Sequence, residues 1–117
     1  MSVSEPLVQS VLLGDAVEHA PVAILVADDE MRYVAVNQYA CELLGYTREE
    51  LLDKRITDIA RYTEAPAEFK QMVASGELSG VTTVVRADGT ELKMRFRASE
   101  TTMAGLLYYV SVSWPED

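Results

Sequence analysis

The segment from Asn37 to Leu52 carries start and stop signals for two consecutive helices, and this order constrains the fold more than any other part of the chain. Asn37 is a residue type that caps the first turn of a helix, and Gly45 is the type that ends one in the left-handed conformation. Thr47 and Glu50 have the spacing of a capping box, in which each side chain binds the other's backbone N–H group. The segment therefore predicts one helix between Asn37 and Gly45 and a second that begins at Thr47.

Two strand pairs are predicted on either side of this helical segment. Residues 22–27 and 33–36 are short apolar runs separated by a turn, a pattern typical of paired strands. Residues 81–86 and 91–98 flank Asp88-Gly89, which is a favoured two-residue hairpin turn, and the second run alternates apolar with charged side chains.

The remaining periodic segments predict one more strand and two more helices. Residues 106–114 alternate with a period of two and place Tyr108 on their apolar face. Helical spacing of apolar residues predicts a helix over residues 7–19, which Gly14 could divide into two pieces, and another over residues 64–75.

The order strand, strand, helices, strand, strand, strand predicts an α+β domain. In this arrangement a five-stranded antiparallel sheet carries short helices on one face, and the N-terminal helix flanks it. We expect an N-terminal helical cap over residues 1–19 and the main domain over residues 20–117. One domain of this kind accounts for all 117 residues.

Composition and charge argue against several classes of function. The chain is 49% hydrophobic and 25% charged, as globular domains are, and its net charge of −9 opposes binding to nucleic acid or to an anionic membrane surface. It has no apolar stretch of membrane-spanning length and no signal-peptide pattern, so we expect a cytoplasmic setting. His19 and Cys41 are the single histidine and cysteine, which is too few for a common zinc site. No nucleophile and base are brought together by the sequence, and we expect no catalytic activity.

The same motifs resemble those of PAS domains. The resemblance spans roughly residues 15–113 and is carried by Ala27-Asp28-Asp29, Val36-Asn37, the run from Leu43 to Leu52 and the Arg86–Thr90 hairpin. It implies the PAS fold and a sensory role in signal transduction. Two positions depart from the family pattern: Met31 stands near a position that normally holds glycine, and Pro115 disfavours a helical continuation after the last strand.

The resemblance also allows the known PAS cofactors to be tested by position. Flavin photosensors of the light-oxygen-voltage type carry a reactive cysteine where this chain has Ile56, while Cys41 lies on the earlier helix. Cys41 has no basic neighbour in the sequence and is interpreted as a small core residue. Oxygen-sensing haem members supply a histidine from the helix expected at residues 64–75, which contains none.

Residues 59–63 and 69–76 are similar to photoactive yellow protein. The cysteine that bears its chromophore corresponds to Tyr62, and its hydrogen-bonding Tyr and Glu correspond to Val36 and Ala40. Because these replacements remove the attachment chemistry, we expect no covalent chromophore, and no haem or flavin adduct either.

The inward faces of the predicted elements are expected to form the core and any pocket within it. They comprise Ile24, Val26, Val36, Ala40, Ile56, Phe69, Met72, Met94, Phe96 and Tyr108. One interpretation is a filled core, because regularly spaced apolar residues usually pack against one another. The other is a noncovalent site for a small uncharged or weakly polar molecule, with adaptable methionines and Tyr108 as a polar anchor. The candidate ligand contacts are Val36, Ala40, Ile56, Phe69, Met72, Met94, Phe96 and Tyr108.

The N-terminal helix is more apolar than a solvated helix requires. Leu7, Val8, Val11 and Leu12 are predicted as a homodimer contact, and the alternative is a cover for the sheet within one molecule. The sequence as a whole indicates a signal-sensing domain that binds a ligand and interacts with a second copy or with other signalling domains. The alternative is a homodimerisation module with a filled core and no ligand.

Overall fold

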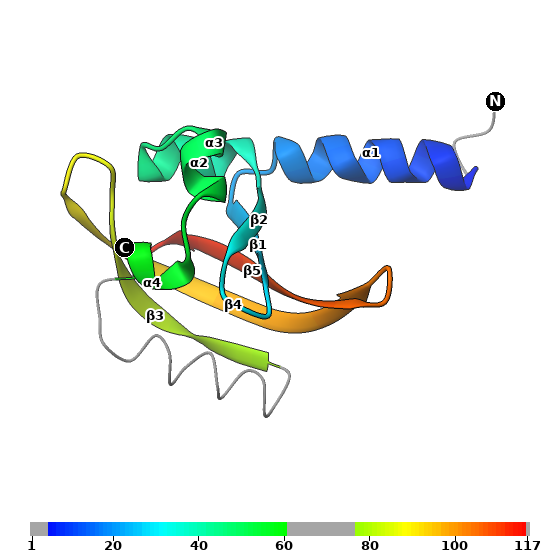
Figure 1. Ribbon diagram of the computed structural model, residues 1–117. Coiled ribbons are helices and arrows are strands. Elements are labelled where there is room, and N and C mark those ends of the chain that lie inside the picture. The colour runs from blue at the N-terminus through cyan, green and yellow to red at the C-terminus, as the bar shows by residue number, and fades with distance from the viewer. Residues whose placement is uncertain (1–4, 61–76, 117) are drawn as a thin grey trace.

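The computed structural model of this protein describes residues 5–60 and 77–116, and Figure 1 shows how its elements are arranged. Five strands form a single antiparallel sheet in the order β2-β1-β5-β4-β3. The short helices lie on one face of it, so the predicted α+β fold is confirmed. The elements are α1 (Pro6–Glu18), β1 (Ala23–Asp28), β2 (Tyr33–Val36), α2 (Gln38–Leu44), α3 (Arg48–Leu52), α4 (Ile56–Ile59), β3 (Glu77–Val85), β4 (Glu91–Met103) and β5 (Leu106–Pro115). The helix predicted over residues 64–75 lies outside the described residues.

The helix signals of the central segment act as predicted. The Asn37 side chain accepts a hydrogen bond from the backbone N–H of Ala40 at 3.1 Å, and α2 ends at Gly45 with φ of 82°. At the start of α3, the Thr47 hydroxyl accepts from the N–H of Glu50, whose carboxylate accepts from the N–H of Thr47. The two helices are therefore specified by local hydrogen bonds, and Leu44 and Leu51 anchor them in the core.

The hairpin between β3 and β4 differs from its predicted form in length. Arg86 N–H donates to the carbonyl of Thr90 at 2.8 Å, and Gly89 N–H donates to the carbonyl of Arg86 at 2.9 Å. Residues 87–89 therefore form a three-residue loop, in which Gly89 takes φ of 86°. The prediction of a two-residue turn was wrong. Asp88-Gly89 also occurs in three-residue loops, where a type I turn is followed by a glycine in the left-handed conformation.

The long C-terminal hairpin extends beyond the predicted strands. β3 begins at Glu77 instead of residue 81, and β4 continues to Met103, pairing with β5 as far as Leu106. Residues 99–102 are polar or charged and carry no apolar alternation, so the pattern could not predict this extension. It is closed by a two-residue turn in which Ala104 and Gly105 have φ of 51° and 79°.

The side chains of β5 face the opposite way from the prediction, which placed Tyr108 toward the helices. Charged residues alternate with Met94, Phe96 and Ala98 on β4, and this fixes which face of β4 is buried. Ser113 pairs with Phe96 and Ser111 with Ala98, and directly paired residues share a face of the sheet. The serines therefore face the helices and Tyr108 faces away, despite the greater hydrophobicity of the tyrosine.

The facing of β1 is also opposite to the prediction. Ala23, Leu25 and Ala27 are buried beneath the helices, whereas Ile24 and Val26 lie on the other face of the sheet. Both alternating sets of β1 are apolar, so the sequence alone did not distinguish them. The two alanines are at most 2% exposed, and their small side chains suit the close approach of α2 to this strand.

The turn between β1 and β2 places Met31 in a backbone conformation that glycine adopts more readily. Met31 has φ of 67°, in the left-handed region. The Asp28 carboxylate accepts hydrogen bonds from the N–H groups of Glu30 at 2.9 Å and Arg32 at 3.0 Å. These bonds on both sides of Met31 hold the backbone in this conformation.

Helix α1 is continuous through Gly14 and extends away from the sheet (Figure 1). Leu7, Val11 and Leu12 are 73%, 56% and 51% exposed, and Val8 is half-buried. The helix therefore does not cover the sheet within one molecule. Within the ranges that the structure describes, no helix is long and apolar enough to cross a membrane.

Candidate ligand cavity

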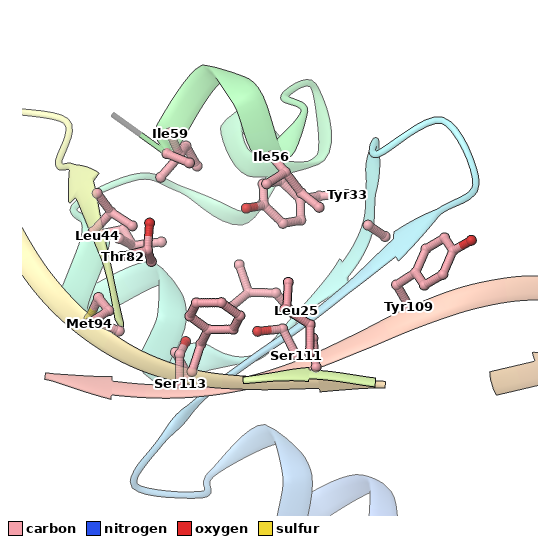
Figure 2. Close-up of a pocket in the computed structure, with 17 residues that line it drawn as sticks. Leu25, Tyr33, Leu44, Ile56, Ile59, Thr82, Met94, Tyr109, Ser111 and Ser113 are labelled. Carbon is pink, nitrogen blue, oxygen red and sulfur yellow. The ribbon is translucent and has the colours of Figure 1, made fainter. Parts of the chain in front are cut away.

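A cavity of about 130 Å³ lies between the inner face of the sheet and helices α2 and α4 (Figure 2). Every strand of the sheet contributes at least one residue to the lining of the cavity, and helices α2 and α4 cover it from above the sheet. Its described lining consists of Ala23, Leu25, Ala27, Tyr33, Leu44, Ile56, Ile59, Ala60, Leu78, Thr82, Val84, Met94, Phe96, Ala98, Tyr109, Ser111 and Ser113.

The polar groups of this lining are hydroxyls. Ser111 and Ser113 lie on the sheet below the cavity, while Tyr33 and Thr82 approach it from β2 and β3, the two edge strands. None of the described lining residues carries a charged side chain. The cavity therefore favours a neutral molecule, because a charged one would lose its hydration without gaining an opposite charge.

The Tyr33 hydroxyl is a hydrogen-bond donor at physiological pH. Burial raises the pKa of Tyr33 above its ordinary value of 10.0, and the negative charge of Asp58 raises this pKa further. Figure 2 shows the hydroxyl directed into the space between the helices and the sheet. It can therefore offer a proton to an acceptor on a guest molecule.

The Thr82 hydroxyl is the one buried side-chain polar atom without a hydrogen-bond partner among the described residues. Buried polar groups in folded proteins nearly always have a partner, since an unmade hydrogen bond is unfavourable. Thr82 also lines the cavity. This unpaired hydroxyl therefore lies where a guest could supply the missing partner.

The structure brings three of the predicted ligand contacts to the cavity, namely Ile56, Met94 and Phe96. Val36 is buried but lies beside a second, shallow hollow near the end of α1, and Ala40 is buried in the core without lining either space. Phe69 and Met72 lie outside the described residues.

The prediction that Tyr108 supplies the polar anchor of the cavity was wrong. Tyr108 faces the other side of the sheet, and its neighbour Tyr109 lines the cavity. The sequence reasoning missed the hydroxyls of Tyr33, Thr82, Ser111 and Ser113. The hydroxyls on β3 and β5 could have been identified from the alternation of β4, which shows clearly which of its residues face inward. A residue paired directly with an inward residue of β4 also faces inward, as Thr82 does opposite Met94 and Ser113 opposite Phe96.

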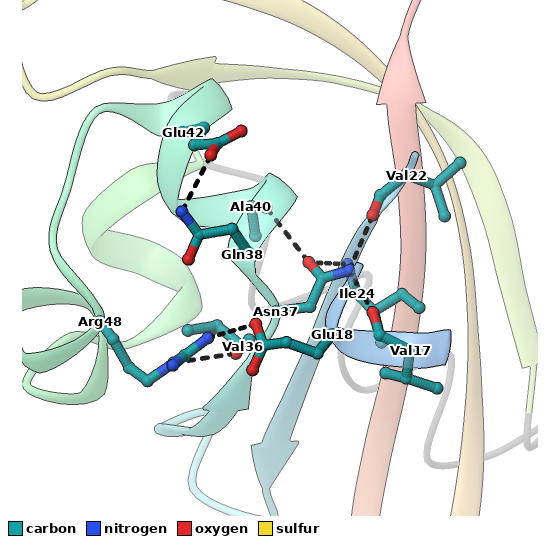
Figure 3. Close-up of polar contacts among 10 residues, drawn as sticks. All are labelled: Val17, Glu18, Val22, Ile24, Val36, Asn37, Gln38, Ala40, Glu42 and Arg48. Atoms are coloured by element: carbon teal, nitrogen blue, oxygen red, sulfur yellow. Dashed lines mark hydrogen bonds and ion pairs between the residues drawn. The ribbon is translucent and has the colours of Figure 1, made fainter. Parts of the chain in front are cut away.

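A polar cluster at the start of α2 joins three segments (Figure 3). The Asn37 side chain accepts from the N–H groups of Ile24 and Ala40 and donates to the carbonyls of Val17 and Val22. Asn37 is 3% exposed, and these four bonds use the full capacity of its amide. The residue therefore fixes the end of α1 and the start of β1 against the start of α2.

Arg48 reinforces this junction from the first turn of α3. Its guanidinium donates to the Glu18 carboxylate at 2.5 Å and to the carbonyl of Val36 at 3.3 Å (Figure 3). Both side chains of the ion pair are more than a third exposed, so water screens most of the attraction between them. The pair acts mainly to orient α1 relative to β2 and α3.

Cys41 does not have the environment of a reactive thiol. Burial raises its pKa, and this effect outweighs the opposing influence of the Arg48 charge. The side chain is half-buried and packs against the main core. The described residues contain no group of three or more His, Cys, Asp or Glu side chains that could hold a metal ion.

Comparison with known proteins identifies the family of this chain. The PAS domain family profile matches residues 21–110. Among solved structures, the chain is similar to the PAS domain of an HTR-like protein from Haloarcula marismortui, with 24% identity, a TM-score of 0.79 and 92% of each chain covered. It is also similar to a domain of a sensory box sensor histidine kinase/response regulator from Geobacter sulfurreducens, with 24% identity, a TM-score of 0.81 and coverage of 96% of this chain and 98% of that one.

An RNA-binding light-oxygen-voltage receptor is a third similar structure, with 21% identity and a TM-score of 0.82. The match covers 98% of this chain but 35% of the receptor. None of the curated protein sequences matched the chain. Because the family profile covers more than half of its length and the strand order agrees with that assignment, this chain belongs to the PAS domain family.

Proposed function

We propose that this PAS domain is a signal-sensing module that binds a small uncharged molecule and passes the resulting change to a protein partner. The observation that carries the proposal is the cavity beneath α2 and α4, which is mostly hydrocarbon with a few hydroxyl groups and no charged lining residue. Ligand sites are typically apolar pockets with a small number of placed polar groups. The similar sensor kinase domain from Geobacter sulfurreducens supports the signalling role.

Helix α2 is proposed to transmit the effect of a bound molecule from the cavity to α1. Leu44 on α2 lines the cavity, and Asn37 at the start of the same helix holds the carbonyl of Val17 in α1. A guest that favours one packing of α2 would shift the population of α1 positions. The exposed apolar side of α1 would then present the signal to a second copy or to another signalling domain.

The binding is proposed to be noncovalent and without catalysis. Ile56 presents a hydrocarbon side chain to the cavity at the position where flavin photosensors carry their reactive cysteine. The domain is proposed to sense its signal without haem, flavin or an attached chromophore. The net charge of −9 argues against nucleic acid and anionic membrane surfaces as partners. The cytoplasmic setting stays a prediction from the sequence.

Mass spectrometry of an organic extract of the purified protein, together with its absorption spectrum, tests the proposal. We expect a stoichiometric neutral guest and no flavin or haem absorption. Ala98→Leu adds volume to a cavity-lining position and should remove the guest, whereas Ser99→Leu, on the opposite face of the same strand, should retain it. A guest retained equally by both variants would contradict binding in this cavity.

A homodimerisation module with no ligand is the second candidate function. The apolar residues Leu7, Val11 and Leu12 of α1 are more than half exposed, and a surface of this kind favours a partner. A guest-free extract, no binding of added small molecules and a stable dimer in solution would together favour this alternative.

A further inference from the structure

We propose that the cavity selects a neutral, single-ring-sized molecule whose hydroxyl or carbonyl group forms a hydrogen bond with Thr82. This inference rests on the proposed ligand-binding function and adds the class of ligand and the residue that recognises it. It combines the size of the cavity, the absence of charge in its described lining and the single unpaired hydroxyl at its edge.

The volume of the cavity indicates the size of the molecule that it can hold. An apolar protein cavity of about 150 Å³ is known to hold benzene. The cavity here is about 130 Å³ and lies between Leu25 and Phe96 of the sheet and Ile56 and Ile59 of α4. One six-membered ring with a small substituent therefore fits within this volume.

The edge strands determine where the polar group of the guest must lie. Thr82 projects from β3 and Tyr33 from β2, at opposite edges of the sheet, and both line the cavity (Figure 2). The Tyr33 hydroxyl stays protonated because burial raises its pKa, so it acts as a donor. The Thr82 hydroxyl can donate or accept, and its lack of a protein partner leaves both capacities open to a ligand.

The absence of charged side chains from the described lining predicts that charged relatives of the same molecule bind weakly. A carboxylate or ammonium group would be buried next to hydroxyls and hydrocarbon with no opposite charge among the described lining residues. The cost of removing such a group from water exceeds the gain from one hydroxyl hydrogen bond. Phenol-like and benzaldehyde-like molecules are therefore favoured over benzoate or anilinium.

Phenol and toluene form a matched pair for testing this inference, because they differ by a hydroxyl in place of a methyl group. Their dissociation constants would be measured on the isotopically labelled full chain by amide chemical-shift titration. Toluene is the more hydrophobic probe, so the informative quantity is how the toluene-to-phenol ratio of dissociation constants changes between proteins. We expect Thr82→Val, which replaces the hydroxyl by a methyl group, to lower this ratio by about three- to tenfold.

Thr83→Val is the control, since it makes the same chemical change at the next residue, which faces the other side of β3. It should leave the ratio unchanged. Thr82→Val should also fold at least as stably as the wild type, because it removes a hydroxyl that has no partner.

Binding of both probes with the same ratio in the wild type and Thr82→Val would overturn the role of Thr82 while leaving the ligand-binding function intact. A ratio that changes in Tyr33→Phe but not in Thr82→Val would assign recognition to the opposite edge strand and also overturn it. Failure of both probes to bind would reject this inference, whereas the proposed function would be rejected only if the organic extract also contained no guest. Binding of benzoate as tightly as phenol would contradict the selection for neutral molecules.

Discussion

The side-chain amide of Asn37 donates a hydrogen bond to the backbone carbonyl of Val17, 2.8 Å away and 20 residues earlier in the chain. This bond joins the cap of α2 to the end of α1. The same amide donates to the carbonyl of Val22, and its oxygen accepts from Ile24 and Ala40. One buried side chain therefore determines both where α2 starts and where α1 is held.

Replacing Asn37 should destabilise the domain strongly. Asn37→Ala removes the helix cap, leaves the carbonyl of Val22 without its donor and leaves that of Val17 with only the N–H of Ala20. We therefore expect a loss of about 2–4 kcal/mol in the free energy of unfolding. Urea denaturation would measure it. Gln38→Ala, which removes only an exposed bond to Glu42, is the control and should cost no more than about 0.5 kcal/mol.

Asn37→Asp separates the two roles of this side chain. The carboxylate can still accept from Ile24 and Ala40, but it places an oxygen against the carbonyls of Val17 and Val22. We expect hydrogen exchange at the C-terminal end of α1 to become faster while exchange within α2 stays slow. Equal acceleration in both helices would contradict a separate tether for α1.

The exposed apolar residues of α1 predict self-association. Replacing Leu7 and Leu12 by glutamate places two charges where the dimer contact would be buried, and we expect the solution mass to fall to that of a monomer. Sedimentation equilibrium would measure the mass, with Ser10→Glu as a control on the same helix. A mass that is unchanged on deleting residues 1–14 would remove the dimer prediction.

The turn between β4 and β5 offers a stabilising substitution. Ala104 has φ of 51° and precedes Gly105, whose φ is 79°, so the two form a turn of the type that prefers Asn-Gly. Alanine is strained in the left-handed region and asparagine tolerates it. Ala104→Asn should raise the free energy of unfolding by about 0.5–1 kcal/mol, measured by urea denaturation. Ala104→Val should lower it, and the opposite order would show that this turn does not limit stability.

Tyr33 predicts a loss of stability at alkaline pH. Its pKa in the folded protein is raised above the ordinary value of 10.0 by burial, with a further contribution from Asp58. Above about pH 10 the unfolded chain loses the proton while the folded protein keeps it, so the free energy of unfolding falls by up to about 1.4 kcal/mol per pH unit. Below this range the stabilisation is fully present.

Tyr33→Phe should remove this contribution. Urea denaturation of both proteins at pH 8 and near pH 11 would show a smaller alkaline loss in the variant, by about 1–2 kcal/mol. Equal losses in the two proteins would mean that Tyr33 ionises in the folded state as readily as in the unfolded state.

The sequence predicted the elements that local hydrogen bonds specify. Asn37, Gly45 and the pair Thr47 and Glu50 act within a few residues of their positions in the chain, so their residue types suffice to place α2 and α3. The charged alternation of β4 likewise predicted its buried face correctly, because Arg95 and Arg97 cannot be buried without partners. These features also carried the resemblance to the PAS family.

The candidate site was predicted only in part, because its polar side depends on pairing between distant strands. Ile56, Met94 and Phe96 reach the cavity as predicted. In β1 both alternating sets are apolar, so hydrophobicity could not choose the inward set, and in β5 the more hydrophobic set faces outward. The choice is made by register: Ser113 lies opposite Phe96 and therefore shares its face. Thus the chain by itself determined the helix ends and the fold class, whereas only the tertiary structure decided which hydroxyls face the cavity, since a shift of one residue in register reverses the facing of a whole strand.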